Sequence, residues 1–266
     1  MVDAAAIAAE LLLGEIYLIT DQDRLTVGIG TSAHKPVARQ SDLDSRTAGF
    51  RISTDLVMTN AVQGSFTGSG ISSGTNSTNP PAGVVTGHHP GCWLLRSSTT
   101  ANSGYRIVTD NDEFRLAGDE VFDLVFRTPA SMTNNQIRFG FLDTTTSTDA
   151  TDGAYFELAA TGVLTGKTAN NATRSTSATL ATLGVSTWYH VRITLNADAT
   201  LVTFSLYDDA GASLGAQSLS SNIPTTSGRE TGAGLVATNS GTTASDVVIV
   251  DYIGVTINRA LQRGAL

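Results

Sequence analysis

Hydrophobic and polar residues alternate most regularly near the start of the chain, over residues 14–30, which read GEIYLITDQDRLTVGIG. The apolar side chains occupy every second position of two limbs: Ile16, Leu18, Leu25, Val27 and Ile29. A polar turn at residues 20–23 separates the limbs, so the pattern predicts a β-hairpin. Because an isolated hairpin is only marginally stable in water, we expect it to pack against another surface, such as a second copy of the chain.

An alanine-rich run over residues 4–13 precedes the hairpin. Asp3 is a suitable N-cap for a helix there, and Gly14 is a suitable residue to end it. A helix this short is marginal by itself, so its apolar stripe needs a partner. We therefore expect residues 1–47 to form an attachment or oligomerisation module, with a helix folded back on its own chain as the alternative.

A second domain is expected over residues 48–258, followed by a tail at residues 259–266. Residues 63–87 are rich in Gly, Ser, Thr and Asn and predict a long surface loop. Alternating apolar and polar positions then predict strands at residues 113–116, 121–127, 136–142, 155–158, 188–195, 201–207 and 247–257. Antiparallel strands in this number, without intervening helices, leave an all-β sandwich or barrel, of which the sandwich is favoured.

The composition narrows the partners of the chain. The 266 residues include 15% charged residues and give a formal net charge of −8 at pH 7, with only 16 scattered Lys and Arg residues. This balance argues against a nucleic-acid partner. We also expect no membrane insertion and no signal peptide, because the apolar run at residues 11–13 is too short and lacks a basic flank. The single cysteine, Cys92, excludes an intrachain disulfide and is expected to be a buried thiol.

A first resemblance is carried by GEIYLITDQDRLTVGIGT and the polar residues 38–43 that follow it. Residues 14–17, the acids Asp21 and Asp23, and the pairs at residues 24–25 and 30–31 match a short module found near the N-termini of phage tail-fibre and related virion proteins. The resemblance is confined to this N-terminal segment. It implies a structural role in a virion and no particular chemistry.

A second resemblance covers residues 48–258. The order of residues 155–158, a Thr-rich excursion, residues 188–194, a hairpin to residues 204–207 and a closing strand at residues 250–255 resembles the concanavalin-A-like jelly roll. That family includes laminin-G modules, lectins and many glycoside hydrolases. The resemblance implies a fold rather than an activity, because many activities share this scaffold.

Catalysis by such a sandwich would need two carboxylates projecting from one strand face into a sugar cleft. The nearest candidates are Asp119, Glu120 and Asp123, with Asp119 and Asp123 on one face of a strand. Their order and spacing depart from the Glu-x-Asp-x-x-Glu pattern of the hydrolases of this fold. Solvated acids at the start of a strand are the simpler interpretation, so we predict no catalytic residues.

Metal binding is the next possibility. The histidines are His34, His88, His89 and His190, and the acid-rich turns are residues 110–113 and 143–152. None of these groups has the spacing of an established zinc or EF-hand motif. We therefore predict no metal site and no cofactor, with calcium at an acid-rich turn as the alternative.

Sugar recognition requires fewer specialised groups than catalysis or metal binding, namely an exposed aromatic ring beside a few amides and hydroxyls. The candidate rings are Trp93, Tyr105, Trp188 and Tyr207. Trp188 shares with His190 and Arg192 the face opposite the apolar row of its strand. That face is either a binding surface or a second buried layer, and the buried interpretation is favoured.

Together these observations predict a virion structural protein that is not an enzyme. We expect a homotrimer that is attached to another virion protein through residues 1–47 and displays a sandwich able to contact host cell-surface glycans. A capsid decoration or head-fibre protein without a receptor role is the alternative, and a glycan-degrading enzyme is a minor one.

Overall fold

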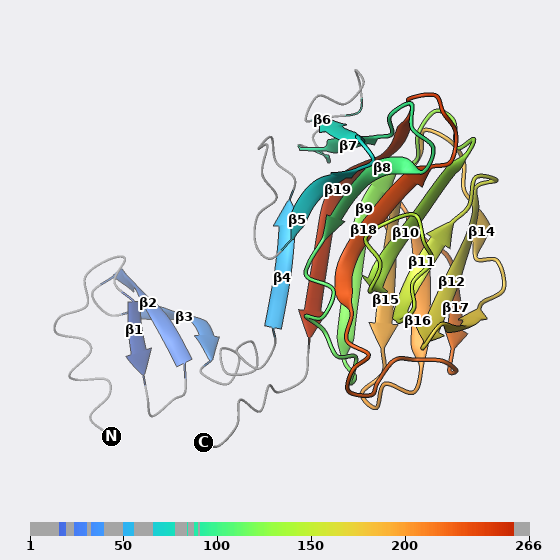
Figure 1. Ribbon diagram of the computed structural model, residues 1–266. Helices are drawn as coiled ribbons and strands as arrows, with labels where there is room; N and C mark the ends of the chain where they lie inside the picture. Colours follow the sequence, from blue (N-terminus) through green and yellow to red (C-terminus); the bar gives the residue numbers. More distant parts are fainter. Residues whose placement is uncertain are drawn as a thin grey trace. The chain divides into compact units, whose positions relative to one another are not determined.

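The computed structural model describes four N-terminal strands by their backbone, and it describes residues 66–77, 84, 88–89 and 91–257 in full (Figure 1). The predicted helix at residues 4–13, the turn at residues 20–23 and the tail at residues 259–266 lie outside the described residues. The chain divides into two compact units, Met1–Phe50 with Ala260–Leu266, and Arg51–Arg259. The predicted boundary after residue 47 stays a prediction.

The first unit contains a three-stranded antiparallel sheet of β1 (Ile16–Ile19), β2 (Arg24–Gly30) and β3 (Ala33–Arg39). Ile16 pairs with Val27 and Leu18 with Leu25, which is the pairing that the alternating pattern predicts. The third strand, β3, pairs with β2 and was not expected from the sequence. It extends the hairpin into a sheet.

The second unit is a sandwich of two eight-stranded antiparallel sheets, and no helix occurs in the described part of the chain. The β10 sheet has the order β13 (Thr173–Thr176), β12 (Val163–Asn170), β11 (Gly153–Leu158), β10 (Asn135–Leu142), β18 (Gly232–Asn239), β8 (Ser103–Val108) and β5 (Thr67–Ile71), with β14 (Ala181–Thr182) paired to β12. The β9 sheet has the order β17 (Ser213–Leu219), β16 (Val202–Asp208), β15 (Trp188–Leu195), β9 (Glu120–Arg127), β19 (Asp246–Ile257), β7 (Trp93–Arg96) and β6 (Thr75–Ser77), with β4 (Phe50–Asp55) paired to β19. The predicted all-β sandwich is therefore confirmed.

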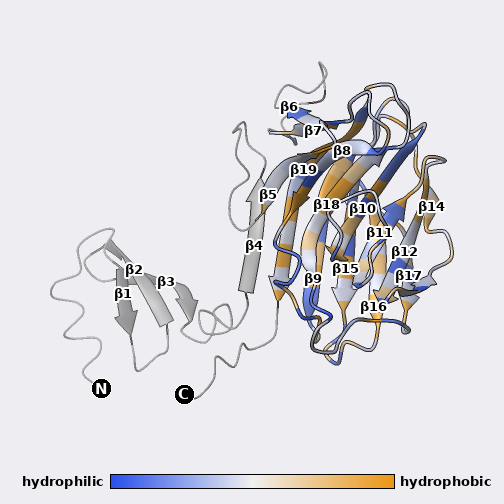
Figure 2. Cartoon of the chain, in the orientation of Figure 1, coloured by the Kyte–Doolittle hydropathy of each residue, from blue (hydrophilic) through white to orange (hydrophobic). Residues whose placement is uncertain are grey.

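The core lies between the sheets, where the apolar positions of alternating strands meet, and Figure 2 shows these positions as orange bands along the strands. Fully buried side chains from β9 and β10 are those that the alternation predicts: Phe122, Leu124, Phe126, Ile137, Phe139 and Phe141. Aromatic rings join the two sheets, with centroid distances of 5.3 Å for Phe126–Phe139 and 5.2 Å for Phe156–Phe204. These contacts fix how the sheets face each other.

Two expectations for the second unit are wrong. Residues 113–116 do not form a strand, because Phe114 makes only an isolated bridge with Thr231. The predicted loop at residues 63–87 contains β5 and β6, which extend one edge of each sheet. Glycine and serine suggested a loop, but the backbone of β5 pairs fully with β8. Among the described residues, no helix has the length and hydrophobicity to cross a membrane.

Candidate functional site

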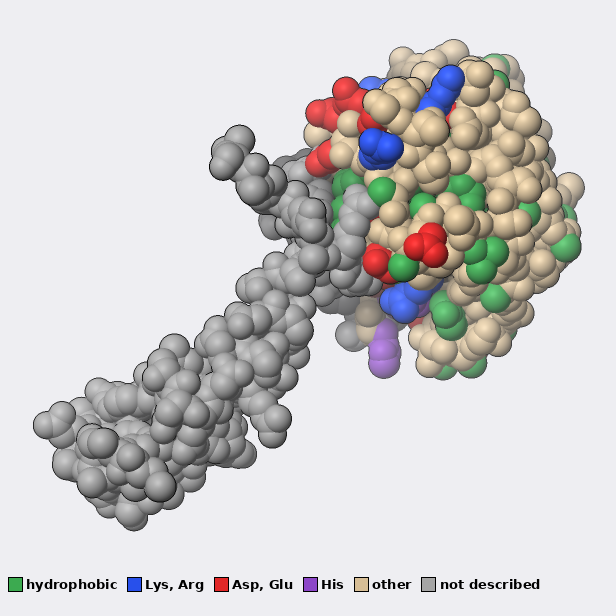
Figure 3. All heavy atoms as spheres, turned by 90° about the horizontal axis from the view of Figure 1, so that it is seen from below, with side chains coloured by type: hydrophobic (Ala, Val, Ile, Leu, Met, Phe, Trp, Pro, Cys, Tyr) green, Lys and Arg blue, Asp and Glu red, His purple; other side chains and the backbone are tan. Residues whose placement is uncertain are grey.

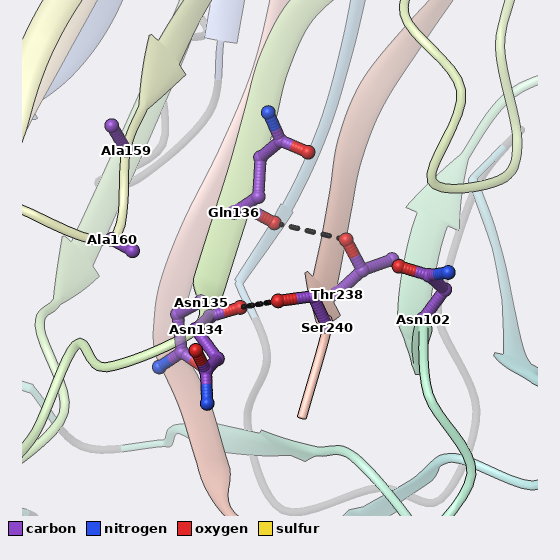
Figure 4. Close-up of a pocket in the computed structure, with 8 residues that line it drawn as sticks. All are labelled: Asn102, Asn134, Asn135, Gln136, Ala159, Ala160, Thr238 and Ser240. Carbon is purple, nitrogen blue, oxygen red and sulfur yellow. Dashed lines mark hydrogen bonds between the residues drawn. The ribbon is translucent and has the colours of Figure 1, made fainter. Parts of the chain in front are cut away.

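A hollow of about 240 Å³ lies at one end of the β10 sheet. In the antiparallel register, the start of β10 at Asn135 lies beside the end of β18 at Asn239, which lies beside the start of β8 at Ser103. The turn that follows β11 closes the hollow. Its lining residues are Asn102, Asn134, Asn135, Gln136, Ala159, Ala160, Thr238 and Ser240 (Figure 4).

Buried amides beneath the hollow hold the strand ends in place. The Nδ2 of Asn239 donates to the Oδ1 of Asn135 at 2.6 Å, and the Nδ2 of Asn135 donates to the backbone oxygens of Ser131 and Asp246. The hydroxyl of Thr238 donates to the backbone oxygen of Gln136 at 3.3 Å (Figure 4). The base of the hollow is thus built from satisfied polar groups at the ends of paired strands.

The rim differs from the base. Asn102 and Asn134 are exposed and adopt φ angles of +59° and +63°, which asparagine tolerates better than most residues. Their side-chain amides have no hydrogen-bond partner within the part of the chain that the structure describes. A Cβ at Gly241 would lie 2.8 Å from the Nδ2 of Asn134, so glycine at that position leaves room for the amide. Two carboxamides are therefore available to a ligand.

The lining is uncharged. Gln136 donates to the Oε2 of Glu157 at 3.3 Å, and that carboxylate is already paired with Arg138 at 2.9 Å and Lys167 at 2.7 Å. Away from the hollow, the face of the sandwich that Figure 3 shows also consists mostly of uncharged polar side chains and backbone, with charged side chains in small groups. The hollow therefore offers hydrogen bonds without a net charge to attract an ion.

Carboxamides and hydroxyls both donate and accept hydrogen bonds, as a ligand rich in hydroxyl groups requires. Pockets for drug-sized ligands usually measure about 300–1,000 Å³. At about 240 Å³ the hollow is smaller, which suits a ligand about as large as one sugar ring.

The comparisons with known proteins bear on this geometry. Residues 88–251 match the family model described as "SO2946-like, C-terminal domain". The chain belongs to this SO2946-like family. No curated protein matches the sequence.

The crystal structure of SO2946 from Shewanella oneidensis MR-1, a protein of unknown function, is 18% identical and superposes with a TM-score of 0.67 over 86% of this chain and 98% of that one. The carbohydrate recognition domain of Emp47p is 13% identical and superposes with a TM-score of 0.52 over 76% of this chain and 93% of that one. The CBM2 module of the evolved Dit of Lactobacillus casei BL23 phage J-1 is 12% identical and superposes with a TM-score of 0.50 over 79% of this chain and 96% of that one. At these identities the neighbours show the fold alone, which is the expected concanavalin-A-like, lectin-type jelly roll.

The SO2946-like sandwich does not arrange its candidate acids as a free catalytic pair. Asp119 precedes β9 in a turn with φ of +63°. Glu120 is buried and accepts hydrogen bonds from the backbone nitrogens of Ala117 and Gly118. Asp123 faces outward and accepts from His190 and Arg192, each at 2.8 Å.

The environment of Asp123 also fixes its charge. Burial raises the pKa of this carboxyl, but the hydrogen bonds from His190 and Arg192 outweigh burial and hold the pKa below its usual value. Asp123 is thus an ionised partner in an ion pair. A general acid needs the opposite shift.

A further motif, residues 70–74, reads G-x-S-x-G and was missed in the sequence. Ser72 and Ser73 adopt φ angles of +47° and +68° there, as a nucleophile elbow would require at its serine. The segment, however, is the turn between β5 and β6, whereas an elbow leads from a strand into a helix. The strained turn is therefore a structural connection.

The histidines are spread over separate contacts. His89 is buried, with its Nδ1 2.8 Å from Asp251 and its Nε2 2.9 Å from Asp209, and its ring stacks on Trp188 at a centroid distance of 3.7 Å. His88 and His190 line a hollow of about 250 Å³ beside it. His34 lies in β3, whose side chains are not described. In the described residues no group of His, Cys, Asp and Glu forms a metal site.

The two acid-rich turns are used differently. Residues 110–112 line an open hollow of about 280 Å³ together with Arg106. In the turn at residues 143–152, Asp149 lies 3.0 Å from Arg138 and 3.1 Å from Arg174. The cations of the protein itself thus neutralise Asp149.

The candidate aromatic rings also separate. Trp93 and Tyr105 are buried, and burial raises the pKa of the Tyr105 hydroxyl. Trp188 is half-buried on the outer face of the β9 sheet, where it packs against a small apolar cluster that includes Cys92. Tyr207 is half-buried and stacks on His190 at 5.2 Å. The buried interpretation of Trp188 is thus only partly right, since the ring lies outside the core between the sheets.

The amide hollow itself was not found from the sequence. Its residues come from four separate segments between residues 102 and 240, and asparagines in turns are ordinary there. A possible signal was the pair of asparagines at residues 134 and 135, directly before a strongly alternating strand.

Proposed function

We propose that this SO2946-like chain is a non-enzymatic carbohydrate-binding protein whose amide hollow takes one sugar of a neutral glycan. The observation that carries the proposal is the pair of carboxamides of Asn102 and Asn134, unpartnered within the described residues, over an uncharged base. The fold shared with the carbohydrate recognition domain of Emp47p supports it. The ion-paired state of Asp123 favours binding over hydrolysis.

The test is a glycan array probed with the full chain and with a double variant, Asn102→Gly with Asn134→Gly. Glycine keeps the positive φ angles and removes only the amides. Each amide lost from a ligand costs about 0.5–1.5 kcal/mol, so the double variant should bind roughly 5- to 150-fold more weakly. Asn171→Gly is the matched control, because Asn171 is exposed with φ of +51° in another turn. Equal binding by the parent and the double variant would contradict the proposal.

We also propose that residues 1–47 attach the sandwich to a virion and assemble it as a homotrimer. The resemblance of residues 14–31 to phage fibre modules supports this role, as does the shared fold of a phage Dit module. A tail-fibre or receptor-binding component is the form we favour, and a capsid decoration or head-fibre protein is the other.

Deletion of residues 1–47 tests this second proposal. The truncated chain should be a folded monomer by light scattering and circular dichroism, whereas the full chain should be oligomeric. A monomeric full chain would contradict the proposal. Labelled particles viewed by electron microscopy would then separate a tail location from a head location.

A further inference from the structure

We infer that the sugar taken by the amide hollow is an N-acetylated hexosamine rather than a plain hexose or an acidic sugar. This inference rests on the proposed function and adds the class of sugar. The observation behind it is the asymmetry of the hollow. Ala159 and Ala160 stand on one side and Asn102 on the other, with Asn134, Thr238 and Ser240 between them (Figure 4).

The alanine side offers methyl groups and no polar side-chain atoms. Ala159 and Ala160 form the turn between β11 and β12, which is closed by hydrogen bonds from Ala159 to Val163 at 3.0 Å and from Gly162 to Ala159 at 2.9 Å. A sugar hydroxyl placed against these methyls would find no side-chain hydrogen-bond partner there. The methyl of an acetamido group suits the same place, since burying it is favourable.

The carboxamide of Asn134 completes the match. An acetamido group has one N–H donor and one carbonyl acceptor, and an asparagine carboxamide has the complementary pair. The amide of Asn134 is unpartnered within the described residues and lies against the backbone at Gly241. An acetamido group with its methyl toward the alanines would thus find both its polar atoms paired, while Asn102 and Ser240 remain for ring hydroxyls.

Charge argues in the same direction. No cationic side chain lines the hollow, so a carboxylate on the sugar would have no ion-pair partner there. The net charge of −8 opposes an anionic ligand further. A free amino sugar is also disfavoured, because its ammonium would meet the alanine methyls.

The test is a set of titrations of the ¹⁵N-labelled full chain with N-acetylglucosamine, N-acetylgalactosamine, glucose, galactose, glucosamine and glucuronate. We expect at least one acetamido sugar to bind about 10-fold or more tightly than the corresponding plain hexose, from one buried methyl and two hydrogen bonds. Ala160→Asp should remove this preference, because a carboxylate would replace the methyl surface that the acetamido methyl contacts. Ala210→Asp, in the exposed turn after β16, is the matched control, and thermal unfolding checks that each variant is folded.

The outcomes separate the two proposals. Equal binding of acetamido sugars and hexoses, both weakened by Asn134→Gly, would overturn the inference and leave the carbohydrate site in place. A preference for acetamido sugars that Ala160→Asp leaves intact would also overturn it, since the acetamido group would then lie elsewhere. Binding of no sugar would overturn both.

Discussion

A glycine in the core gives the sharpest test of the sandwich. Gly166 on β12 pairs with Phe156 on the neighbouring strand β11. The ring of Phe204, from the facing sheet, lies over Gly166 and contacts the ring of Phe156. A Cβ at Gly166 would lie 2.5 Å from both Cγ and Cδ2 of Phe204. Real Cβ atoms do not approach so closely, so Gly166→Ala must displace the ring or separate the sheets.

The size of the effect follows from two opposing contributions. Overpacking a core usually costs about 1–3 kcal/mol. Replacing glycine by alanine also restricts the unfolded chain, which returns about 0.4–1 kcal/mol. We therefore expect Gly166→Ala to lower the free energy of unfolding by about 1–2 kcal/mol, or to lower Tm by roughly 2–8 °C for a unit of this size.

Urea unfolding followed by tryptophan fluorescence measures this change, because Trp93 and Trp188 both lie in the sandwich. Gly184→Ala is the control, since its nearest side-chain neighbour would be 3.3 Å away, and it should change stability by less than about 0.5 kcal/mol. In the double variant Gly166→Ala with Phe204→Leu, the smaller side chain should relieve the clash and recover about 1 kcal/mol of the summed costs. The packing described here would be refuted if the costs of the two substitutions were fully additive. It would also be refuted if Gly166→Ala left the free energy of unfolding unchanged.

Three further predictions concern single side chains outside the core between the sheets. Burial raises the pKa of Asp149, but the hydrogen bond from Tyr155 and the nearby cations outweigh burial and lower this pKa below its usual value. The stabilising contribution of Asp149 is therefore present above the usual aspartate pKa of 3.8 and is lost as the pH falls through the lower folded value. Asp149→Asn should flatten the acid limb of a plot of stability against pH, and an unchanged limb would contradict this. Burial, with a smaller effect of Asp251, raises the pKa of the Cys92 thiol to about 12, so iodoacetamide at pH 8 should modify it only in denaturant, and rapid reaction of the native chain would disagree. His89→Gln should cost roughly 1–3 kcal/mol and shift the fluorescence of Trp188 to longer wavelength, because the stacked ring is lost, whereas an identical spectrum would show that the stack is absent in solution.

The sequence predicted several of the strands that have one buried face and one half-exposed face, although it missed β12, whose burial also largely alternates. On β9 every second residue is buried, so the apolar row of Phe122, Leu124 and Phe126, with Asp123 and Arg127 on the opposite face, was a sufficient signal. The same holds for β15, where Tyr189 and Val191 alternate with Trp188 and His190. For such strands the burial pattern and the sequence pattern have the same period.

Strand β18 could not be found in this way, because all its residues are buried and many are small. Its inner face meets the core, and its outer face at Val236 joins a cluster with Ala150 from the turn that lies over the β10 sheet. Gly234 pairs with Gly140, and a Cβ there would lie 2.2 Å from the backbone oxygen of Ile107. Small residues that a turn covers give no periodic signal.

The candidate site was harder to predict than the fold. The sequence indicated sugar recognition by an aromatic platform, but Trp93 and Tyr105 are buried, and Trp188 is stacked under His89. The asparagines that form the hollow became neighbours only through the register of β8, β18 and β10. Register depends on pairing between distant segments, which a pattern of single residues does not encode.

The most direct test of the central claim is the mapping of amide chemical shifts when N-acetylglucosamine and glucose are added separately to the ¹⁵N-labelled full chain. Our account predicts that the side-chain NH₂ signals of Asn102 and Asn134 and the backbone signals of residues 159–160 and 238–240 move together in a saturable manner. Saturable shifts confined to the outer face of the β9 sheet, around His190 and Tyr207, or no shifts with either sugar, would contradict it.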